Sequence, residues 1–298
     1  MARDLISRYV WIVDTISRYG RLTREELNRL WIDSRYSDGK PMPERTFYHH
    51  RRAIEENFHI ELACDRDGAY YIVEDTRHGS RAFSDWLLDS YAVSGALSGS
   101  AEVAGKVMLE NVPSAREYLP IALEAIKEQR KIKFTYAGFN RSREEREILF
   151  SPYFVRLYRQ RWYMVGRREA TGDTRTYALD RVRAMTITSE NFIPDPHDSD
   201  PELFFANLLG ITSSKAEVRT VQIRTTPTQA KYLRALPLHE SQQESVHDFY
   251  SIFTYRLKLN YELVHEIMAL GSAATVIAPK ELKAMVKEEL QNMLSAYS

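Results

Sequence analysis

The chain of 298 residues lacks the features of a secreted or membrane-bound protein. It has a single cysteine, Cys64, so a disulfide within the chain is impossible and a CxxC zinc site is absent. It contains no stretch of roughly 18 apolar residues, and its first residues lack the apolar core of a signal peptide. We therefore expect a soluble cytoplasmic protein with no membrane association.

Signatures of catalysis are missing as well. The sequence has no GxSxG, no HExxH and no phosphate-cradling glycine loop. Histidines such as His59, His78 and His239 are spread along the chain without metal-ligand spacing, so we expect neither a metal nor a cofactor. Asp180 and Glu190 make no convincing acid–base pair. The sequence therefore predicts a protein that is not an enzyme.

Net charge also favours no partner, because 41 Lys and Arg balance 41 Asp and Glu. The distribution is uneven, however, since residues 130–183 hold fourteen Lys and Arg against six Asp and Glu. Aromatic residues are frequent in the same stretch. Cations and aromatics together suit an anion with flat faces, such as a nucleotide or a single strand of nucleic acid. The alternative is a β-rich core with a solvated basic edge.

Residues 1–75 have the pattern of a DNA-binding domain. Apolar spacing predicts helices over residues 4–19 and 43–57, and between them Thr23 and Glu26 make a capping box that opens a second helix. After the third helix, two alternating segments around Asp67-Gly68 predict a β-hairpin. Three helices followed by a hairpin is the order of a winged helix-turn-helix.

The third helix is then the candidate recognition helix, with Phe47, Ile54 and Phe58 facing inward. Its opposite face carries the predicted DNA-binding residues Arg45, Thr46, Tyr48, His49 and Arg52. The two arginines are candidates for phosphate or guanine contacts, and the other three for hydrogen bonds to base edges or backbone. The alternatives are a small helical domain with a polar face and a winged helix that binds protein.

Residues 76–117 are predicted to form a helical linker that contributes to dimerisation. A helix within residues 115–130 then leads into short strands over residues 132–136, 148–157, 162–167 and 175–187, which predict a small β-barrel for residues 118–190. Pro152 indicates an edge strand or a bulge. On the last strand, alternation predicts one face with Arg175, Tyr177, Leu179 and Arg181.

Residues 191–298 form the last predicted region, an α+β domain. Its strands are expected over residues 218–225, 251–259 and 274–278, each followed by a helix, over residues 228–236, 261–270 and 279–297. The expected order is therefore β-α-β-α-β-α.

With these residues in view, the chain resembles the WYL-domain transcriptional regulators over essentially its whole length. The resemblance rests on Trp162-Tyr163-Met164 with Gly166, on Phe134-Thr135-Tyr136 and Pro152, and on the run Arg175–Val182. Met164 stands where Leu is usual, and Ala178 stands where many members carry a further Arg. The segment Pro237–Gln242, with Gly271 and Pro279, is similar to the C-terminal extension that commonly follows a WYL domain.

The resemblance implies a multidomain α+β protein with an N-terminal winged helix, a helical linker, an Sm-like β-barrel and a C-terminal α+β extension. It also implies a homodimeric transcriptional regulator that binds a double-stranded operator and senses a nucleotide or nucleic-acid-like anion. We expect Arg156, Arg175 and Arg181 to hold phosphates, and Tyr136, Trp162 and Tyr163 to offer stacking surface. Trp162 is favoured as a core residue and Tyr163 as the better ligand contact. The alternative is an interaction or oligomerisation module whose winged helix does not bind DNA specifically.

Overall fold

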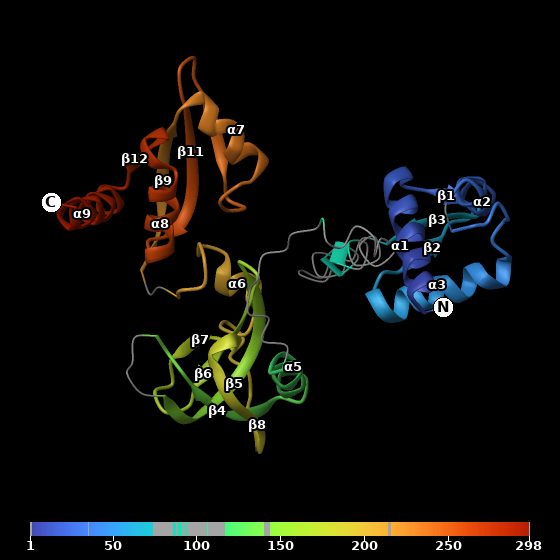
Figure 1. Cartoon of the computed structure of the whole chain (residues 1–298), viewed down its shortest axis with the longest axis horizontal. Helices are drawn as coiled ribbons and strands as arrows, with labels where there is room; N and C mark the ends of the chain where they lie inside the picture. The colour runs from blue at the N-terminus through green and yellow to red at the C-terminus, as the bar shows by residue number, and fades with distance from the viewer. Residues whose placement is uncertain are drawn as a thin grey trace. The chain divides into compact units, whose positions relative to one another are not determined.

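The computed structural model describes residues 2–34, 36–73, 86–87, 89–90, 93, 106, 117–139, 144–213 and 216–297. The chain divides into two compact units, Met1–Glu110 and Asn111–Ser298 (Figure 1). The helical linker predicted over residues 76–117 lies almost wholly outside the described residues. Within the described part, no helix combines the length and apolarity that crossing a bilayer requires.

Over the described residues up to Val73, the N-terminal unit contains three helices and a hairpin in the predicted order, with an additional short strand between the first two helices that was not predicted. The elements are α1 (Ala2–Tyr19), β1 (Leu22–Thr23), α2 (Arg24–Ile32), α3 (Glu44–Phe58), β2 (Leu62–Cys64) and β3 (Ala69–Ile72). The strands lie in the order β1-β3-β2. The side chains of Phe47, Ile54 and Phe58 are buried in the core that α3 shares with α1 and α2, as predicted.

Local sequence explains where α2 begins. The Thr23 hydroxyl accepts a hydrogen bond from the backbone N–H of Glu26 at 3.3 Å, and the Glu26 carboxylate accepts one from the N–H of Thr23 at 2.8 Å. Each residue thereby satisfies a backbone donor at the helix start that would otherwise lack a partner. The predicted capping box is confirmed.

The C-terminal unit begins with α5 (Leu119–Lys127) and a five-stranded antiparallel sheet. Its strands are β4 (Arg130–Tyr136), β5 (Glu145–Tyr158), β6 (Arg161–Arg168), β7 (Thr174–Ala178) and β8 (Val182–Asn191), in the order β7-β6-β5-β4-β8. Apolar side chains of the strands and of α5 form one core. We call this the middle sheet (Figure 1).

The middle sheet corrects two predictions. The segment expected as one strand over residues 175–187 is two strands, because Leu179–Arg181 forms a 3₁₀ turn between β7 and β8. The expected closed barrel is not formed: β7 and β8 are the two edges of the sheet and do not pair with each other. The turn between them redirects the chain, so the short β7 ends before it can form a ladder with β8.

Two positions show why the middle sheet is bent. Pro152 lies on β5, a central strand, where the register with β6 shifts between Pro152 and Phe154. It therefore marks a bulge and not an edge. Gly166 on β6 faces it, and a Cβ on Gly166 would lie 2.1 Å from the carbonyl oxygen of Ser151. Only glycine permits this close approach of the two strands.

The rest of the unit is a second sheet with helices. After α6 (Pro201–Phe205), the elements are β9 (Val218–Thr225), α7 (Pro227–Ala235), β10 (Gln243–Val246), β11 (Ser251–Lys258), α8 (Tyr261–Ala269), β12 (Ala274–Ala278) and α9 (Lys280–Ala296). The four antiparallel strands lie in the order β10-β11-β9-β12, which together with the helices gives a ferredoxin-like topology. We call this the C-terminal sheet. The sequence analysis missed β10, whose residues Gln-Glu-Ser-Val show no apolar alternation.

A segment between the two sheets is held by both. Arg156 of the middle sheet donates a hydrogen bond to the carbonyl oxygen of Gly210 at 2.9 Å. From the other side, the Asn260 side-chain amide donates to the carbonyl oxygen of Leu209 at 2.8 Å. The Glu262 carboxylate accepts a hydrogen bond from the Thr212 N–H at 2.9 Å. These contacts fix the two sheets within one compact unit.

Candidate effector pocket and DNA-binding face

The outward face of α3 carries the side chains predicted from the sequence. Arg45, Tyr48, His49 and Arg52 are exposed, and Thr46 is half-buried. Arg52 donates from Nε to Glu56 at 2.7 Å, one helical turn later, and this hydrogen bond raises the pKa of its guanidinium. Both partners are exposed, so the pair is weak and can exchange for a phosphate.

His50, on the other side of α3, was not predicted to have a role. It is buried against α1, with its ring centroid 5.1 Å from that of Tyr9 in an edge-to-face arrangement. Burial, together with the positive charge of Arg8, lowers the pKa of His50 to about 4. The neutral imidazole therefore packs α3 onto α1 at neutral pH.

A pocket lies at the edge of the core of the middle sheet. Its volume is about 390 Å³, and it is lined by Tyr136, Gly138, Phe139, Glu145, Arg168, Arg175, Thr176, Tyr177 and Arg181. Three of these residues, Tyr136, Arg175 and Arg181, were predicted from the sequence. The strands β4 and β7 and the turn after β7 bring them together.

The charged side chains give the pocket a net positive charge, since three arginines face one glutamate. Arg168 forms an ion pair with Glu145, and Arg175 pairs with Asp173 at 3.1 Å near the solvent. The Nε atoms of Arg168 and Arg181 are buried, and neither has a hydrogen-bond partner among the described residues. A buried donor without a partner costs free energy, so both atoms favour the approach of a further hydrogen-bond acceptor.

Aromatic rings form the apolar part of the pocket. The rings of Tyr136 and Tyr177 meet edge to face with centroids 4.9 Å apart, and the Tyr136 hydroxyl accepts a hydrogen bond from the N–H of Ala178 at 3.3 Å. The Arg181 guanidinium lies over the ring of Phe139, 3.7 Å from its centroid. Phe139 itself is largely exposed. A planar guanidinium beside aromatic rings suits a ligand that combines negative charge with a flat ring.

The structure places the other predicted effector residues outside this pocket. Arg156 is half-buried, with its guanidinium 3.8 Å from the centroid of the Phe205 ring, and burial lowers its pKa. Trp162 packs partly buried against the middle core. Tyr163, the expected contact, is 8% exposed, and burial raises the pKa of its hydroxyl. Arg156 therefore joins the two sheets, and the two aromatics help to form the sheet itself.

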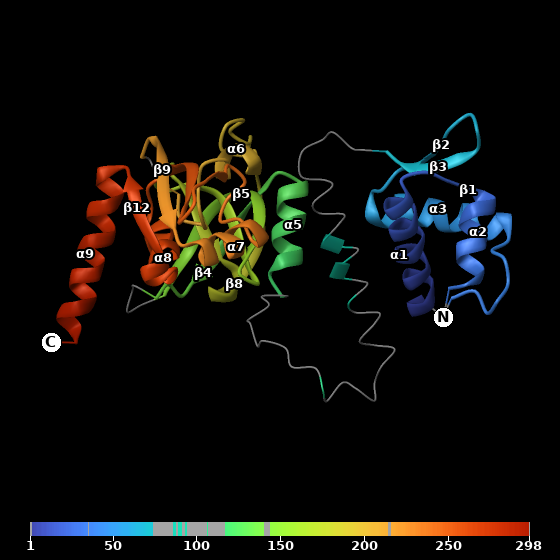
Figure 2. The same ribbon diagram turned by 90° about the horizontal axis from the view of Figure 1, so that it is seen from above.

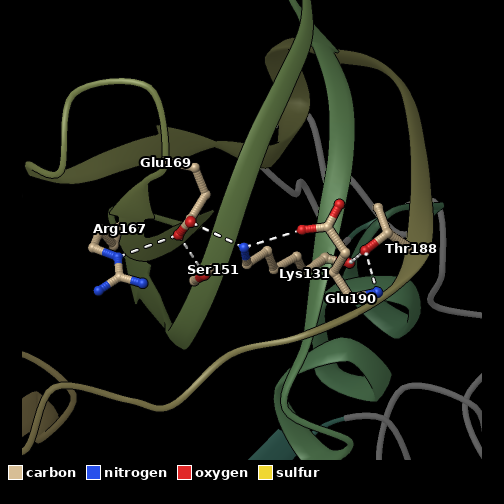
Figure 3. A network of polar contacts seen from close by, with 6 residues as sticks. All are labelled: Lys131, Ser151, Arg167, Glu169, Thr188 and Glu190. Atoms are coloured by element: carbon tan, nitrogen blue, oxygen red, sulfur yellow. Dashed lines mark hydrogen bonds and ion pairs between the residues drawn. The ribbon is translucent and has the colours of Figure 1, made fainter.

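Several cations of residues 130–183 pair with carboxylates away from the pocket (Figure 3). Lys131 on β4 donates to Glu169 and to Glu190, each at 3.1 Å, and the hydrogen bond that it donates to Glu169 is the main cause of its raised pKa. Glu169 also accepts from Ser151 at 2.8 Å and from Arg167 at 3.2 Å. This network ties strands together. Part of the positive excess therefore stabilises the sheet, as the alternative interpretation allowed.

The pocket residues that the sequence analysis did not assign to the site are Gly138, Phe139, Glu145, Arg168, Thr176 and Tyr177. Pairing of β6 with β7 sets Arg167 opposite Thr174, so the turn over residues 169–173 brings Arg168 close to Arg175. Strand pairing across that turn was the available signal. Glu145 gave no such signal, because its pairing with Tyr136 on β4 cannot be recognised from the local sequence. Elsewhere in the described part of the chain, no group of three or more His, Cys, Asp or Glu side chains is arranged to hold a metal ion.

The geometry so far defines a class of protein, a helix-capped antiparallel sheet with a cationic and aromatic pocket, followed by a ferredoxin-like domain. Comparison with family models identifies both parts: residues 117–187 match the WYL domain and residues 217–294 match the WCX domain. The chain therefore contains a WYL domain followed by a WCX domain. A comparison with curated proteins gives no significant match.

Two solved structures show similarity across nearly the whole chain. Proteasome accessory factor B/C (PafBC) of Arthrobacter aurescens is 20% identical with a TM-score of 0.35, covering 97% of this chain and 46% of that one. A CRISPR Cas-related protein is 11% identical with a TM-score of 0.41, covering 99% of this chain and 84% of that one. This chain thus spans less than half of the length of the PafBC chain. At these TM-scores neither likeness carries an argument about function.

Proposed function

We propose that the protein is a DNA-binding transcriptional regulator, without enzymatic activity, whose WYL domain senses a nucleotide or a nucleic-acid-like anion. The WYL match and the resemblance to WYL regulators support this proposal. The observation that carries it is the pocket of the middle sheet, where two buried arginine Nε atoms, with no hydrogen-bond partner among the described residues, lie beside aromatic rings. Effector binding then changes the DNA affinity by favouring one arrangement of the N-terminal units.

The pocket is tested with the double variant Arg175→Ala/Arg181→Ala in the full chain. Mononucleotides and short single-stranded oligonucleotides are added, and the rise in melting temperature is measured, since a ligand of the folded state stabilises it. The matched control is Arg146→Ala/Arg183→Ala, which removes two exposed arginines near the same sheet. We expect the pocket variant to lose the ligand-induced rise and the control to keep it. A full rise in the pocket variant would exclude the pocket as the effector site.

DNA binding is proposed for the outward face of α3, in the manner of a winged helix. The element order and the exposed cations and hydrogen-bonding groups of that face support it. The probe is duplex DNA that the full chain selects from a random pool, titrated at two salt concentrations. A contact from Arg52 to guanine is worth about 1–3 kcal/mol of discrimination, so Arg52→Ala should relax specificity by roughly that amount.

The control for this experiment is Arg18→Ala, which removes an exposed arginine from α1 of the same unit. If Arg52→Ala and Arg18→Ala bind the selected duplex as the natural chain does, α3 is not the recognition helix. If no duplex is selected over competitor DNA, the alternative of an interaction module without specific DNA binding is favoured.

The exposed end of α9 supports the proposed homodimer. Leu290, Met293 and Tyr297 are 52%, 46% and 89% exposed, and they recur at spacings of three and four residues along α9 and its C-cap. Such spacing is typical of a helix that packs against another helix. Toward the start of α9, Leu282 is buried in the core of the C-terminal sheet. The exposed end therefore continues the apolar stripe by which the start of α9 packs against that core. We propose that two copies pair through this end.

The dimer interface is tested with Leu290→Glu/Met293→Glu, with Gln291→Glu/Asn292→Glu as the control on the exposed polar side of the same helix. Molar mass is measured by light scattering during gel filtration. The first variant should elute as a monomer and the second as a dimer. A dimeric mass for both variants would place the interface elsewhere.

A further inference from the structure

Helices cover one face of the C-terminal sheet. Val221, Ile223, Phe253 and Tyr255 point into a core that is completed by side chains of α7 and α8. Figure 1 shows both helices beside this sheet. Because side chains alternate along a strand, the intervening residues lie on the opposite side. We call that side the open face.

Strand register brings polar and cationic side chains together on the open face. The antiparallel pairing of β9 with β11 sets Thr220 opposite Arg256, Gln222 opposite Thr254 and Val218 opposite Lys258. Arg224 lies further along β9, opposite Ile252. Arg224, Arg256 and Thr220 are exposed, and the others are half-buried. The central strands therefore present three cations along with groups that form hydrogen bonds.

On the open face, β9 and β11 carry cations but no carboxylates. In the part of the chain that the structure describes, no carboxylate pairs with Arg224, Arg256 or Lys258. The contrast lies on the other face of the sheet, where Arg234 of α7 is held by Glu244 at 2.6 Å. Arg256 lies four residues from the position opposite Arg224, about 14 Å along the strand, so the cations are spread and do not surround one point.

Aromatic rings extend the open face at the end near Arg224. The rings of His247 and Tyr250 are stacked with centroids 4.5 Å apart, and the Arg224 guanidinium lies 6.0 Å from the Tyr250 centroid. Phe249, in the turn between β10 and β11, is almost fully exposed. Exposed aromatic rings beside cations on a sheet offer stacking surface to unpaired bases, which a duplex does not present.

We propose that the open face of the C-terminal sheet is a second binding site, separate from the pocket of the middle sheet, and that it binds single-stranded nucleic acid. Arg224 and Arg256 contact phosphates of one strand that are not neighbours, and Tyr250 stacks on a base. The occupant is a polymer because the cations are spread along two strands, and it is an anion because β9 and β11 place no Asp or Glu on this face. A second copy of this chain would bring cations against cations, which disfavours a symmetric pair of open faces.

The test measures binding of fluorescent oligothymidylate and oligouridylate of about 16 nucleotides, near the upper limit of one small nucleic-acid-binding fold. All proteins are full-length chains in the Arg175→Ala/Arg181→Ala background, so that the pocket does not contribute. Arg224→Ala/Arg256→Ala removes two cations from the open face. The control Lys231→Ala/Lys287→Ala removes two exposed cations from α7 and α9. The two oligonucleotides distinguish DNA from RNA as the source of the ligand.

We expect the open-face variant to bind at least tenfold more weakly, and its plot of log affinity against log salt to be shallower by about 1.4 for two lost phosphate contacts. Tyr250→Ala should weaken binding on the order of tenfold without a change in salt slope. The control should bind as its parent does. Equal binding by parent and open-face variant overturns the proposal, and so does an equal loss in the control.

Two further results would show that the open face does not bind the oligonucleotide. If Arg224→Ala/Arg256→Ala changes the molar mass in gel filtration and leaves oligonucleotide binding intact, the open face is a contact between copies and the proposal is wrong. If the background chain has lost all oligonucleotide binding, the pocket is the sole site: the proposal fails while the proposed function stands. Binding that persists in the background supports the proposal even where the pocket shows no effector.

Discussion

The two sheets of the C-terminal unit differ in how far their arginine side chains are buried. The middle sheet bends and brings arginines next to its core, where Arg168 and Arg181 each have a buried Nε without a partner among the described residues. The C-terminal sheet leaves Arg224 and Arg256 exposed on its open face. Local sequence does not distinguish the two cases, since both place arginines among alternating polar and apolar residues.

The difference teaches what each surface can recognise. Desolvated guanidinium groups in a pocket of about 390 Å³ bind a ligand tightly when its acceptors reach their N–H donors. A ligand that does not fit leaves a donor unsatisfied and binds more weakly. Exposed guanidinium groups keep their water and contact phosphates with little selectivity. The middle sheet is thus suited to a specific small anion or chain end. The C-terminal sheet is suited to the backbone of a polymer.

The largest predicted effect concerns the bend that forms the pocket. Gly166→Ala places a Cβ 2.1 Å from the Ser151 carbonyl oxygen and 2.8 Å from the Phe150 ring, so β5 and β6 must separate. We expect a loss of at least about 3 kcal/mol in the free energy of unfolding. Urea denaturation of the C-terminal unit, followed by the fluorescence of Trp162, measures it.

Gly138→Ala is the matched control, since its Cβ would meet only the Tyr136 ring at an ordinary 3.6 Å. It should change stability by less than about 1 kcal/mol. Similar stabilities of the two variants would show that the fold does not require the close approach of β5 to β6. The bend of the middle sheet would then not explain how it differs from the C-terminal sheet.

The second prediction is that acid destabilises the N-terminal unit through His50, a residue that neither sheet of the C-terminal unit contains. Burial lowers the pKa of His50 to about 4 in the folded chain, against an ordinary value near 6.5. The unfolded chain therefore takes up the proton first. The stability that neutral His50 provides is present above pH 6.5 and is lost as the pH falls toward 4, by about 3 kcal/mol in total.

Amide hydrogen exchange of α3 between pH 7 and pH 4 measures this loss, after correction for the intrinsic pH dependence of exchange. His50→Leu removes the titrating group and should flatten the profile, whereas His49→Gln, an exposed neighbour, should leave it steep. Equal profiles for His50→Leu and the natural chain would mean that His50 is not buried in solution.

Much of the fold was predictable because its signals are local. The capping box of Thr23 and Glu26, the hairpin turn at Asp67-Gly68 and the alternation of Ile132 with Phe134 each depend on residues close in sequence, and the structure has all three. The wrong or missing predictions depend on strand pairing between segments that are far apart in the sequence. Nothing local shows that Leu179–Arg181 turns the chain, or that the polar β10 adds an edge strand next to β11.

The candidate pocket was predictable only in part, for the same reason. Tyr136, Arg175 and Arg181 stood out because residue type and spacing placed cations and rings on strands. Tyr163 and Arg156 had the same signals, yet one is buried in the sheet and the other holds Gly210. Their roles depend on which side of a bent sheet they face and on a segment about 54 residues away, which alternation alone does not specify.

The third prediction tests whether Arg156 joins the two sheets or binds a ligand. Arg156→Ala removes the hydrogen bond to Gly210 and the guanidinium over the Phe205 ring. We expect a loss of about 2 kcal/mol in unfolding free energy, with effector binding at the pocket unchanged. The control Arg159→Ala breaks an exposed ion pair with Glu266 and should cost less than about 1 kcal/mol. A stable Arg156→Ala chain with lost effector binding would return Arg156 to the effector site.

The smallest predicted effect concerns the open face of the C-terminal sheet. Arg224 and Arg256 are exposed, and no carboxylate among the described residues pairs with them, so Arg224→Ala/Arg256→Ala should change the free energy of unfolding by less than about 1 kcal/mol. Thermal unfolding beside Lys231→Ala/Lys287→Ala measures it. A larger loss would mean that these arginines stabilise the sheet as Lys131 does in the middle sheet, through contacts that their exposure does not indicate. A small loss means that weaker oligonucleotide binding by this variant reports on the surface itself, because the fold beneath it is intact.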